Sequence, residues 1–356
     1  MATDTINIKI TKVLQSRISD VDFDNLPFGK HFSDHMFEMD YFDGQWHEPT
    51  IVPFAHLELH PATSALHYGQ SIFEGLKAQR GDNGEILVFR PDMNAKRFNE
   101  SAQRMCMAEV PEEIFLEGLK QLLDIDREWI STKEGQSLYI RPLLFATDDY
   151  VGIRPSERYK FIIITSPVGA YYSDPVPVKI ETHYTRAAEG GVGQAKVAGN
   201  YAASLYPAKL AQEEGYRQLI WTDAKTHEYI EEAGTMNVIF MINDTLITPD
   251  EGKDTILKGI TKRSVLEIAK DWGYKVEERR VTVEEIVNAM KEGTLQEAFG
   301  AGTAATIAPI SLIAYDGVDY TLPPVEEREF SNKVKEYING YKKGREEDKY
   351  NWLMKI

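Results

Sequence analysis

Two patterns predict the strands of the chain: apolar residues at every second position, and short continuous runs of apolar residues. Short β-rich runs predict strands at residues 86–89 and 136–145. A continuous apolar run at 160–165 predicts a strand that is buried on both faces. In the second half, further strands are expected at residues 178–182, 219–222 and 237–242.

An apolar period near 3.6 residues predicts the helices. Pro91 suits a first helical turn, where its missing N–H costs nothing, and the helix should extend to Met105. A second amphipathic helix is expected at 112–129, although Gly118 in its interior costs roughly 1 kcal/mol against alanine. The later helices are expected at 202–214 (with a kink at Pro207), at 263–272, from Thr282 with Glu285 completing a capping box, and at 326–343.

The stretch SPVGAYYSDPVP at residues 166–177 concentrates Pro, Gly and Ser, which favours an exposed connector between two domains. Strands and helices mix on both sides of it without a regular βαβ alternation. We therefore predict an α+β chain with a smaller N-terminal domain at 1–168, a loop at 169–181 and a larger C-terminal domain at 182–356.

Composition narrows the class of protein. The 356 residues include 56 acidic and 40 basic side chains, a formal net charge of −16, which argues against affinity for nucleic acid or anionic membranes. Cys106 is the single cysteine, so an internal disulfide is excluded and a cytoplasmic location is expected. No apolar run is long enough to predict a membrane helix, and the N-terminus does not predict a secretory signal. The eight histidines lack the spacing of a zinc site, so no metal is expected.

The segment RAAEGGVGQAKVAGNY at 186–201 places Lys196 among small residues. Burial against backbone would lower the pKa of its amine, and a neutral amine attacks aldehydes. Lys196 could therefore hold an aldehyde cofactor as a Schiff base. Taken alone, the segment is more typical of a surface lysine in a flexible glycine loop.

Three later features supply complementary chemistry. Glu232 in EEAGTMN, expected at a tight turn, could pair with a protonated pyridine nitrogen. Gly259-Ile260-Thr261 leads into a helix, whose first amides and threonine hydroxyl suit a phosphate. Gly302-Thr303-Ala304 is expected to form a second anion cup of the same kind. Each of these, taken singly, is also a common turn.

The order of eight motifs resembles the fold-type IV, or class IV, pyridoxal-phosphate enzymes, and most closely the branched-chain amino acid aminotransferases. The motifs are SDHM (33–36), LHYGQSIFEGLKA (66–78), LYIRP (138–142), SPVGAYY (166–172), KVAGNY (196–201), EEAGTMN (231–237), LKGITKR (257–263) and FGAGTAA (299–305). SDHM and SPVGAYY resemble the longer, eukaryotic-type branch. The resemblance implies a two-domain fold like that of D-amino acid aminotransferase, with pyridoxal 5'-phosphate at the domain interface.

The resemblance also implies roles for individual residues. Lys196 would be the Schiff-base lysine and proton shuttle, Glu232 the partner of the pyridine nitrogen and Tyr201 the partner of the 3'-oxygen. The phosphate would be held by Arg97, Ile260, Thr261 and Thr303, with Arg186 and Thr235 also in the cofactor pocket. The substrate pocket would be lined by Phe28, Tyr68, Phe73, Tyr139, Tyr171 and Thr235, with Arg141 for the glutamate carboxylate and the Thr303 and Ala304 amides for the α-carboxylate.

The function that the resemblance implies is a ping-pong transfer of the amino group from L-leucine, L-isoleucine or L-valine to 2-oxoglutarate. A homodimer is expected, because in this family a neighbouring subunit completes the pocket. Two other class IV activities stay open, those of D-amino acid transaminase and aminodeoxychorismate lyase. A non-catalytic pyridoxal-phosphate-binding protein would retain the lysine and phosphate ligands without the substrate groups.

Overall fold

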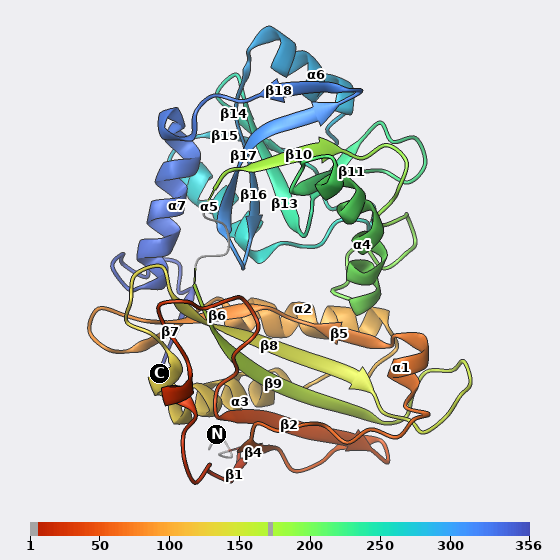
Figure 1. Ribbon diagram of the computed structural model, residues 1–356, viewed down its shortest axis with the longest axis vertical. Helices are drawn as coiled ribbons and strands as arrows, with labels where there is room; N and C mark the ends of the chain where they lie inside the picture. The colour runs from red at the N-terminus through yellow and green to blue at the C-terminus, as the bar shows by residue number, and fades with distance from the viewer. Residues whose placement is uncertain (1–5, 170–173) are drawn as a thin grey trace. The chain divides into compact units, whose positions relative to one another are not determined.

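The computed structural model describes residues 6–169 and 174–356, and the chain forms two compact units (Figure 1). The first comprises residues 1–171 together with 340–356, and the second comprises 172–339. This division differs from the expected one because the C-terminal segment returns to the first unit. A strand, β10 (Val176–Ile180), also lies within the loop expected at 169–181.

The first unit contains a mostly antiparallel sheet in the order β1-β4-β2-β9-β8-β6-β7-β19, with β3 beside β2 and β5 beside β8. Only β1 and β4 pair in parallel among its described strands. The strands are β1 (Lys9–Ile10), β2 (His35–Phe42), β3 (Gln45–Trp46), β4 (Thr50–Pro53), β5 (Ser71–Phe73), β6 (Leu76–Arg80), β7 (Ile86–Phe89), β8 (Ser137–Ala146), β9 (Tyr159–Val168) and β19 (Leu353–Lys355). The last strand joins the sheet edge at β7, which explains why the C-terminus belongs to this unit.

Helices α2 (Pro91–Arg104) and α3 (Glu112–Ile125) pack on this sheet, while the short α1 (Ser64–Tyr68) precedes β5. Their core is aromatic: the ring of Phe161 lies 5.4 Å from Phe98, 5.6 Å from Phe37 and 5.7 Å from Phe115. A Cβ at Gly118 would approach the ring of Phe37 to 2.6 Å. The glycine in the middle of α3 therefore lets this helix lie close to β2, which offsets its low helix propensity.

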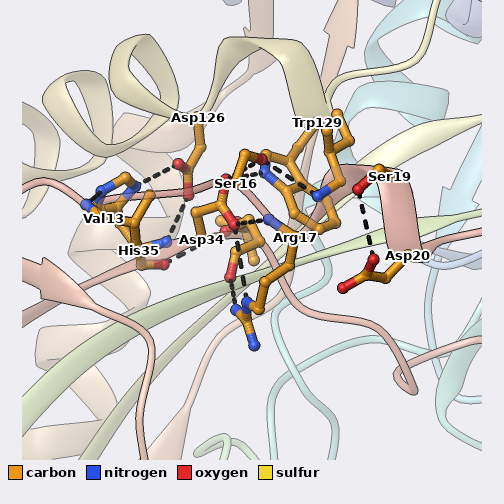
Figure 2. A network of polar contacts seen from close by, with 12 residues as sticks. Val13, Ser16, Arg17, Ser19, Asp20, Asp34, His35, Asp126 and Trp129 are labelled. Atoms are coloured by element: carbon orange, nitrogen blue, oxygen red, sulfur yellow. Dashed lines mark hydrogen bonds and ion pairs between the residues drawn. The ribbon is translucent and has the colours of Figure 1, made fainter.

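The segment before β2 is fixed by polar contacts beneath α3 (Figure 2). The His35 ring bonds Asp126 through Nδ1 at 2.6 Å and accepts the Val13 amide at Nε2 at 3.0 Å. Asp34 accepts bonds from Ser16, from the Arg17 amide and from the indole of Trp129. Asp34 and His35 of the SDHM motif therefore act structurally here, because their side chains anchor the N-terminal segment.

The second unit contains a sheet in the order β12-β11-β10-β17-β16-β13-β14-β15. Because β12 also pairs with β13, six of these strands close into a ring around an apolar core. The strands are β10 (Val176–Ile180), β11 (Gln218–Thr222), β12 (Ile230–Ala233), β13 (Met236–Ile242), β14 (Thr245–Thr248), β15 (Lys275–Glu278), β16 (Leu295–Gly302), β17 (Thr306–Tyr315) and β18 (Val318–Thr321), the last pairing with β17. The helices are α4 (Ala198–Glu213), α5 (Ile260–Asp271), α6 (Val283–Glu292) and α7 (Glu329–Lys342).

Most predicted elements are confirmed, with differences at their ends. Thr282 caps α6 by accepting the amide of Glu285, as the capping box predicts. The helix expected at 112–129 ends at Ile125, and a separate short 3-10 turn follows at Arg127–Trp129. The exposed connector expected at 166–177 is wrong at both ends, because β9 extends through Val168 and β10 begins at Val176. Partner strands satisfy the backbone of both segments, which outweighs their Pro and Gly content.

Within the described residues, no helix is both long and apolar enough to cross a membrane. The same part of the chain contains no group of three or more His, Cys, Asp or Glu side chains that could hold a metal ion.

Candidate active site

Lys196 lies just before α4, and its amine points at the first turn of that helix. Nζ donates a hydrogen bond to the Tyr201 hydroxyl at 2.8 Å and lies 5.2 Å from the centre of the tyrosine ring. The side chain is half-buried. The amine therefore faces a phenol and an aromatic ring, whereas the glycine-rich sequence suggested backbone alone.

Glu232 occupies strand β12, two residues before the turn at Gly234, and not the turn itself as the sequence suggested. Its carboxylate is buried and has partners on both oxygens. Oε1 accepts Nδ2 of Asn237 at 3.1 Å and the amide of Leu257 at 3.0 Å, while Oε2 lies 2.8 Å from Nη2 of Arg186. The carboxylate is consequently held in one orientation.

Burial is the main influence on the Glu232 carboxyl. It raises the pKa of Glu232 above its ordinary value, while Arg186, the Leu257 amide and Lys196 act in the opposite direction. The charge of Lys196 is among those that lower the pKa of Glu232, so the amine lies within electrostatic range of the carboxylate. A small cavity of the same unit is lined by Arg186, Tyr201, Glu232 and Thr235. Thr235 itself is exposed, in the turn between β12 and β13.

The N-terminus of α5 supplies free backbone donors. Gly259 is the N-cap, and no side chain among the described residues caps the helix, so the amides of the first residues, Ile260 and Thr261, are open to an anion. A Cβ at Gly259 would lie only 1.7 Å from Oδ1 of Asn237. Because Asn237 also bonds Glu232, one side chain connects the carboxylate to the start of α5.

Thr303 and Ala304 lie in the hairpin between β16 and β17, both partly buried. The expectation of a second helix-type anion cup at Gly302-Thr303-Ala304 is therefore wrong, because two antiparallel strands flank the segment and no helix follows it. A hairpin turn can still present amides and a hydroxyl to a ligand, but without a helix dipole.

In the first unit, four of the residues expected at the substrate come together. The Arg141 guanidinium lies 4.5 Å from the Phe73 ring centre, and its Nη2 donates to the Tyr139 hydroxyl at 2.9 Å. Phe28 packs edge-on against Tyr139, with 4.9 Å between ring centres. A Cβ at Gly75 would meet the Tyr139 hydroxyl at 2.4 Å, so the glycine leaves room for that phenol.

The remaining expected residues of this unit behave differently. Arg97 is buried in α2 and binds Glu74, with Nε 2.7 Å from Oε1 and Nη2 2.9 Å from Oε2. Tyr68, the last residue of α1, is 43% exposed, and its ring lies 6.1 Å from that of His67. Tyr171 lies outside the described residues.

Sequence reasoning missed two residues that organise the site. Asn237 ties Glu232 to Leu257, and Glu74 holds Arg97. Both lie inside motifs that were recognised, EEAGTMN and IFEG. A buried carboxylate or amide needs hydrogen-bond partners, so the polar residues within these motifs could have been singled out from the sequence. The sequence does not identify their partners.

Comparison with known proteins places these features in a family. The chain matches the class IV amino-transferases over residues 71–313. A probable branched-chain-amino-acid aminotransferase of Staphylococcus epidermidis is 47% identical over 337 residues, which cover 93% of this chain and 94% of that protein. Branched-chain-amino-acid aminotransferase 2 of Bacillus subtilis is 42% identical over 360 residues, covering 100% of this chain and 98% of the relative.

A solved structure extends the likeness to three dimensions. The branched-chain amino acid aminotransferase of Escherichia coli is 27% identical with a TM-score of 0.72, over 88% of this chain and 98% of that chain. Matched over more than half its length, the chain belongs to the class IV aminotransferases. The two relatives and this structure all have names that specify branched-chain amino acids.

Proposed function

We propose that this protein is a branched-chain-amino-acid aminotransferase that works with pyridoxal 5'-phosphate. In a ping-pong cycle, L-leucine, L-isoleucine or L-valine gives up its amino group, which 2-oxoglutarate then accepts. The products are a branched-chain 2-oxo acid and L-glutamate, and the reaction is reversible. The observation that carries the proposal is the identity of 42–47%, over almost the whole chain, to relatives named for this activity.

The second unit presents the groups that such a cofactor requires: an amine, an anionic partner for a ring nitrogen and free amides for a phosphate. When bound, pyridoxal phosphate supplies an aldehyde and an electron-withdrawing ring. The residues therefore fit the cofactor chemically at three separate points.

Lys196 provides the amine that binds the aldehyde and that moves a proton at the substrate Cα. Tyr201, whose hydroxyl lies 2.8 Å from Nζ, orients this amine and offers a hydrogen-bond donor to an oxygen bound beside it. A fixed hydroxyl of this kind also stabilises a neighbouring anionic oxygen, which lowers the cost of keeping charge near the amine.

Glu232 holds a proton at the ring nitrogen. Its buried carboxylate is kept in place by Asn237 and the Leu257 amide. Burial disfavours the charged carboxylate and raises the pKa of Glu232, and it also reduces the screening by water, so that a protonated nitrogen beside the carboxylate would interact with it strongly. Arg186, whose Nη2 lies 2.8 Å from Oε2 of Glu232, lowers the pKa of this carboxyl and so opposes the effect of burial.

The phosphate is assigned to the amides of Ile260 and Thr261 at the start of α5, with the hydroxyls of Thr261 and Thr303. Arg97 is assigned to the same phosphate. Its Glu74 partner, which also accepts Nδ2 of Asn94 at 2.7 Å, keeps the guanidinium in a fixed orientation.

Arg141 is assigned to the side-chain carboxylate of glutamate. Its Nε is buried and has no hydrogen-bond partner among the described residues, so a donor remains available for an anion. Phe28, Phe73 and Tyr139 surround it with apolar surface that suits leucine, isoleucine and valine. Tyr68, Tyr171 and Thr235 complete the proposed lining, and the Thr303 and Ala304 amides receive the α-carboxylate.

A homodimer, with part of the pocket supplied by the neighbouring subunit, belongs to the proposal, as does a cytoplasmic location. Tyr68 supports the homodimer. Its side chain is 43% exposed in a single chain, and a neighbouring subunit would cover this aromatic residue of the proposed substrate pocket. The single cysteine, Cys106, supports the cytoplasmic location, because it is a free thiol.

The decisive test is an initial-rate panel on the holoenzyme with L-leucine, D-alanine and aminodeoxychorismate. We expect L-leucine with 2-oxoglutarate to be turned over fastest. Faster turnover of D-alanine, or pyruvate release from aminodeoxychorismate, would replace the proposal with another class IV activity. Borohydride reduction followed by peptide mapping should place the trapped cofactor on Lys196.

Mixing the holoprotein with L-leucine alone separates an enzyme from a passive carrier. An enzyme converts the cofactor absorbance to that of the pyridoxamine form, and an inert binding protein leaves the spectrum unchanged. A Lys196→Ala variant is the matched control and should not produce the absorbance of the pyridoxamine form, because it lacks the amine that moves the proton at the substrate Cα.

A further inference from the structure

A second cavity of the second unit, of about 310 Å³, is lined by none of the residues assigned to the cofactor. It is bordered by the hairpin between β11 and β12, by the segment after β14 and by the residues that follow β15. Its volume is within the range of small-molecule sites. The aminotransferase reaction as derived above leaves this cavity without a role.

The floor of the cavity contains a buried acid. Glu231 is 6% exposed, and its Oε2 has no hydrogen-bond partner among the described residues. Burial raises the pKa of Glu231, although a hydrogen bond with the Thr255 side chain and the charge of Arg186 oppose that effect. A ligand cation would supply the missing counter-charge.

The other acids that line the cavity already have partners. Asp223 accepts backbone amides of its own hairpin, including those of Thr226 and Tyr229 at 2.9 Å. Asp250 accepts the amide of Gly252 at 2.9 Å. Glu189 is paired with Lys253. Glu231 is therefore the acid of this lining with capacity for a ligand.

The lining of the cavity also contains three basic side chains. Lys225, Lys253 and Arg280 are exposed, and all three lower the pKa of the Glu189 carboxyl, with Lys253 contributing most. Of the three, Lys253 forms an ion pair with Glu189. Arg280 is held with its guanidinium 3.3 Å from the ring centre of Tyr229. Because Lys253 is already paired with Glu189, Lys225 and Arg280 are the cations of this lining to which a ligand carboxylate could bind.

From this arrangement we propose that the cavity binds a small zwitterion, with its ammonium at Glu231 and its carboxylate at Lys225 and Arg280. The apolar side chains of Ile230, Ile256 and Pro249 border the same space and accommodate the carbon chain between the two charges. This site is separate from the one where the transamination substrates are assigned.

Isothermal titration calorimetry tests the proposal on holoenzyme in which borohydride has fixed the cofactor to the protein. The probes are glycine, β-alanine, 4-aminobutyrate and 5-aminovalerate, which carry the same two charges at increasing separation. Butylamine and butyrate carry one charge each. We expect saturable binding of at least one zwitterion, one per chain, about tenfold or more tighter than either single-charge analogue.

Variants locate the binding. Glu231→Gln keeps the side-chain size, and Arg280→Met removes an exposed cation, so that at least one of the two should fold. Each should weaken binding by about tenfold, whereas Lys209→Met, on the exposed surface of α4, should not. Absence of saturable binding by every probe would overturn the proposal. Binding that is lost in Arg141→Met but retained in Glu231→Gln would overturn it too, because the heat would then come from the transamination pocket.

Discussion

The guanidinium of Arg186 and the carboxylate of Glu232 form a buried ion pair, with Nη2 2.8 Å from Oε2. The same Nη2 donates to the carbonyl oxygens of Gly193 and Thr255, so the arginine is fixed by the backbone on both sides. The pair couples the glycine-rich segment before Lys196 to strand β12. The carboxylate can therefore keep its orientation when a charged ring binds beside it.

Glu232→Gln should lower kcat by about 10²–10⁴-fold while the protein still binds pyridoxal phosphate. The amide keeps the size of the side chain but cannot hold a proton at a ring nitrogen, so transition-state stabilisation is lost. Initial rates with L-leucine measure the loss, and cofactor content is measured by absorbance. Glu232→Asp, which retains the charge, should lose less. Equal activity of wild type and Glu232→Gln would contradict the assigned role.

Gly259→Ala should weaken cofactor binding and lower the unfolding temperature. The added Cβ would lie 1.7 Å from Oδ1 of Asn237 and would displace the amide that holds Glu232. We expect a loss of about 1–3 kcal/mol in the free energy of unfolding, as for other overpacked sites. Gly199→Ala is the control, since nothing lies within 4 Å of its Cβ. Equal unfolding temperatures of the two variants would contradict the prediction that a Cβ at position 259 displaces Asn237.

Arg97→Met should destabilise the first unit by about 3–5 kcal/mol, because it leaves the buried carboxylate of Glu74 without its ion-pair partner. Urea unfolding measures this change. The double variant Arg97→Met with Glu74→Gln removes the stranded charge and should recover much of the stability. Affinity for pyridoxal phosphate should stay low in both variants, which separates the role in folding from the role at the phosphate. Full recovery of cofactor affinity in the double variant would exclude Arg97 as a phosphate ligand.

Lys342 gives the chain a pH-dependent stability. Burial lowers the pKa of Lys342 to about 7, and the charge of Lys77 adds to this effect. Below pH 7 the lysine is charged in both the folded and the unfolded state, so folding bears the full cost of burying the charge. Between about pH 7 and the ordinary value of 10.5 the unfolded chain binds more protons, and stability rises with pH.

Lys342→Met should therefore stabilise the protein more at pH 6 than at pH 9. The difference between the two pH values should be on the order of 1–3 kcal/mol, from urea unfolding curves of wild type and variant. Lys120→Met, at an exposed position of α3, provides the control and should change stability equally at both pH values. If Lys342→Met stabilised the protein more at pH 9 than at pH 6, burial of the Lys342 charge would be excluded as the cause of the pH dependence.

Local features of the chain were predictable wherever the signal was itself local. The helix that begins at Pro91, the capping box at Thr282 and the buried strand after Lys160 depend on propensity and period, and the structure confirms them. The division between the two units lies within the connector expected at 166–177. The two ends of that connector were mispredicted, because Pro and Gly are compatible with strands whose partners lie far away in sequence. β10, for example, pairs with β11 and with β17.

By itself, the sequence determined the order of the elements, the motifs around Lys196 and Glu232 and the family to which the chain belongs. Only the tertiary structure decided which groups meet: Asn237 with Glu232, Arg97 with Glu74, and Arg141 with Tyr139. The physical reason is that a side chain's partners, burial and pKa depend on strand register and on closure of the sheet. These bring together residues that no local pattern connects.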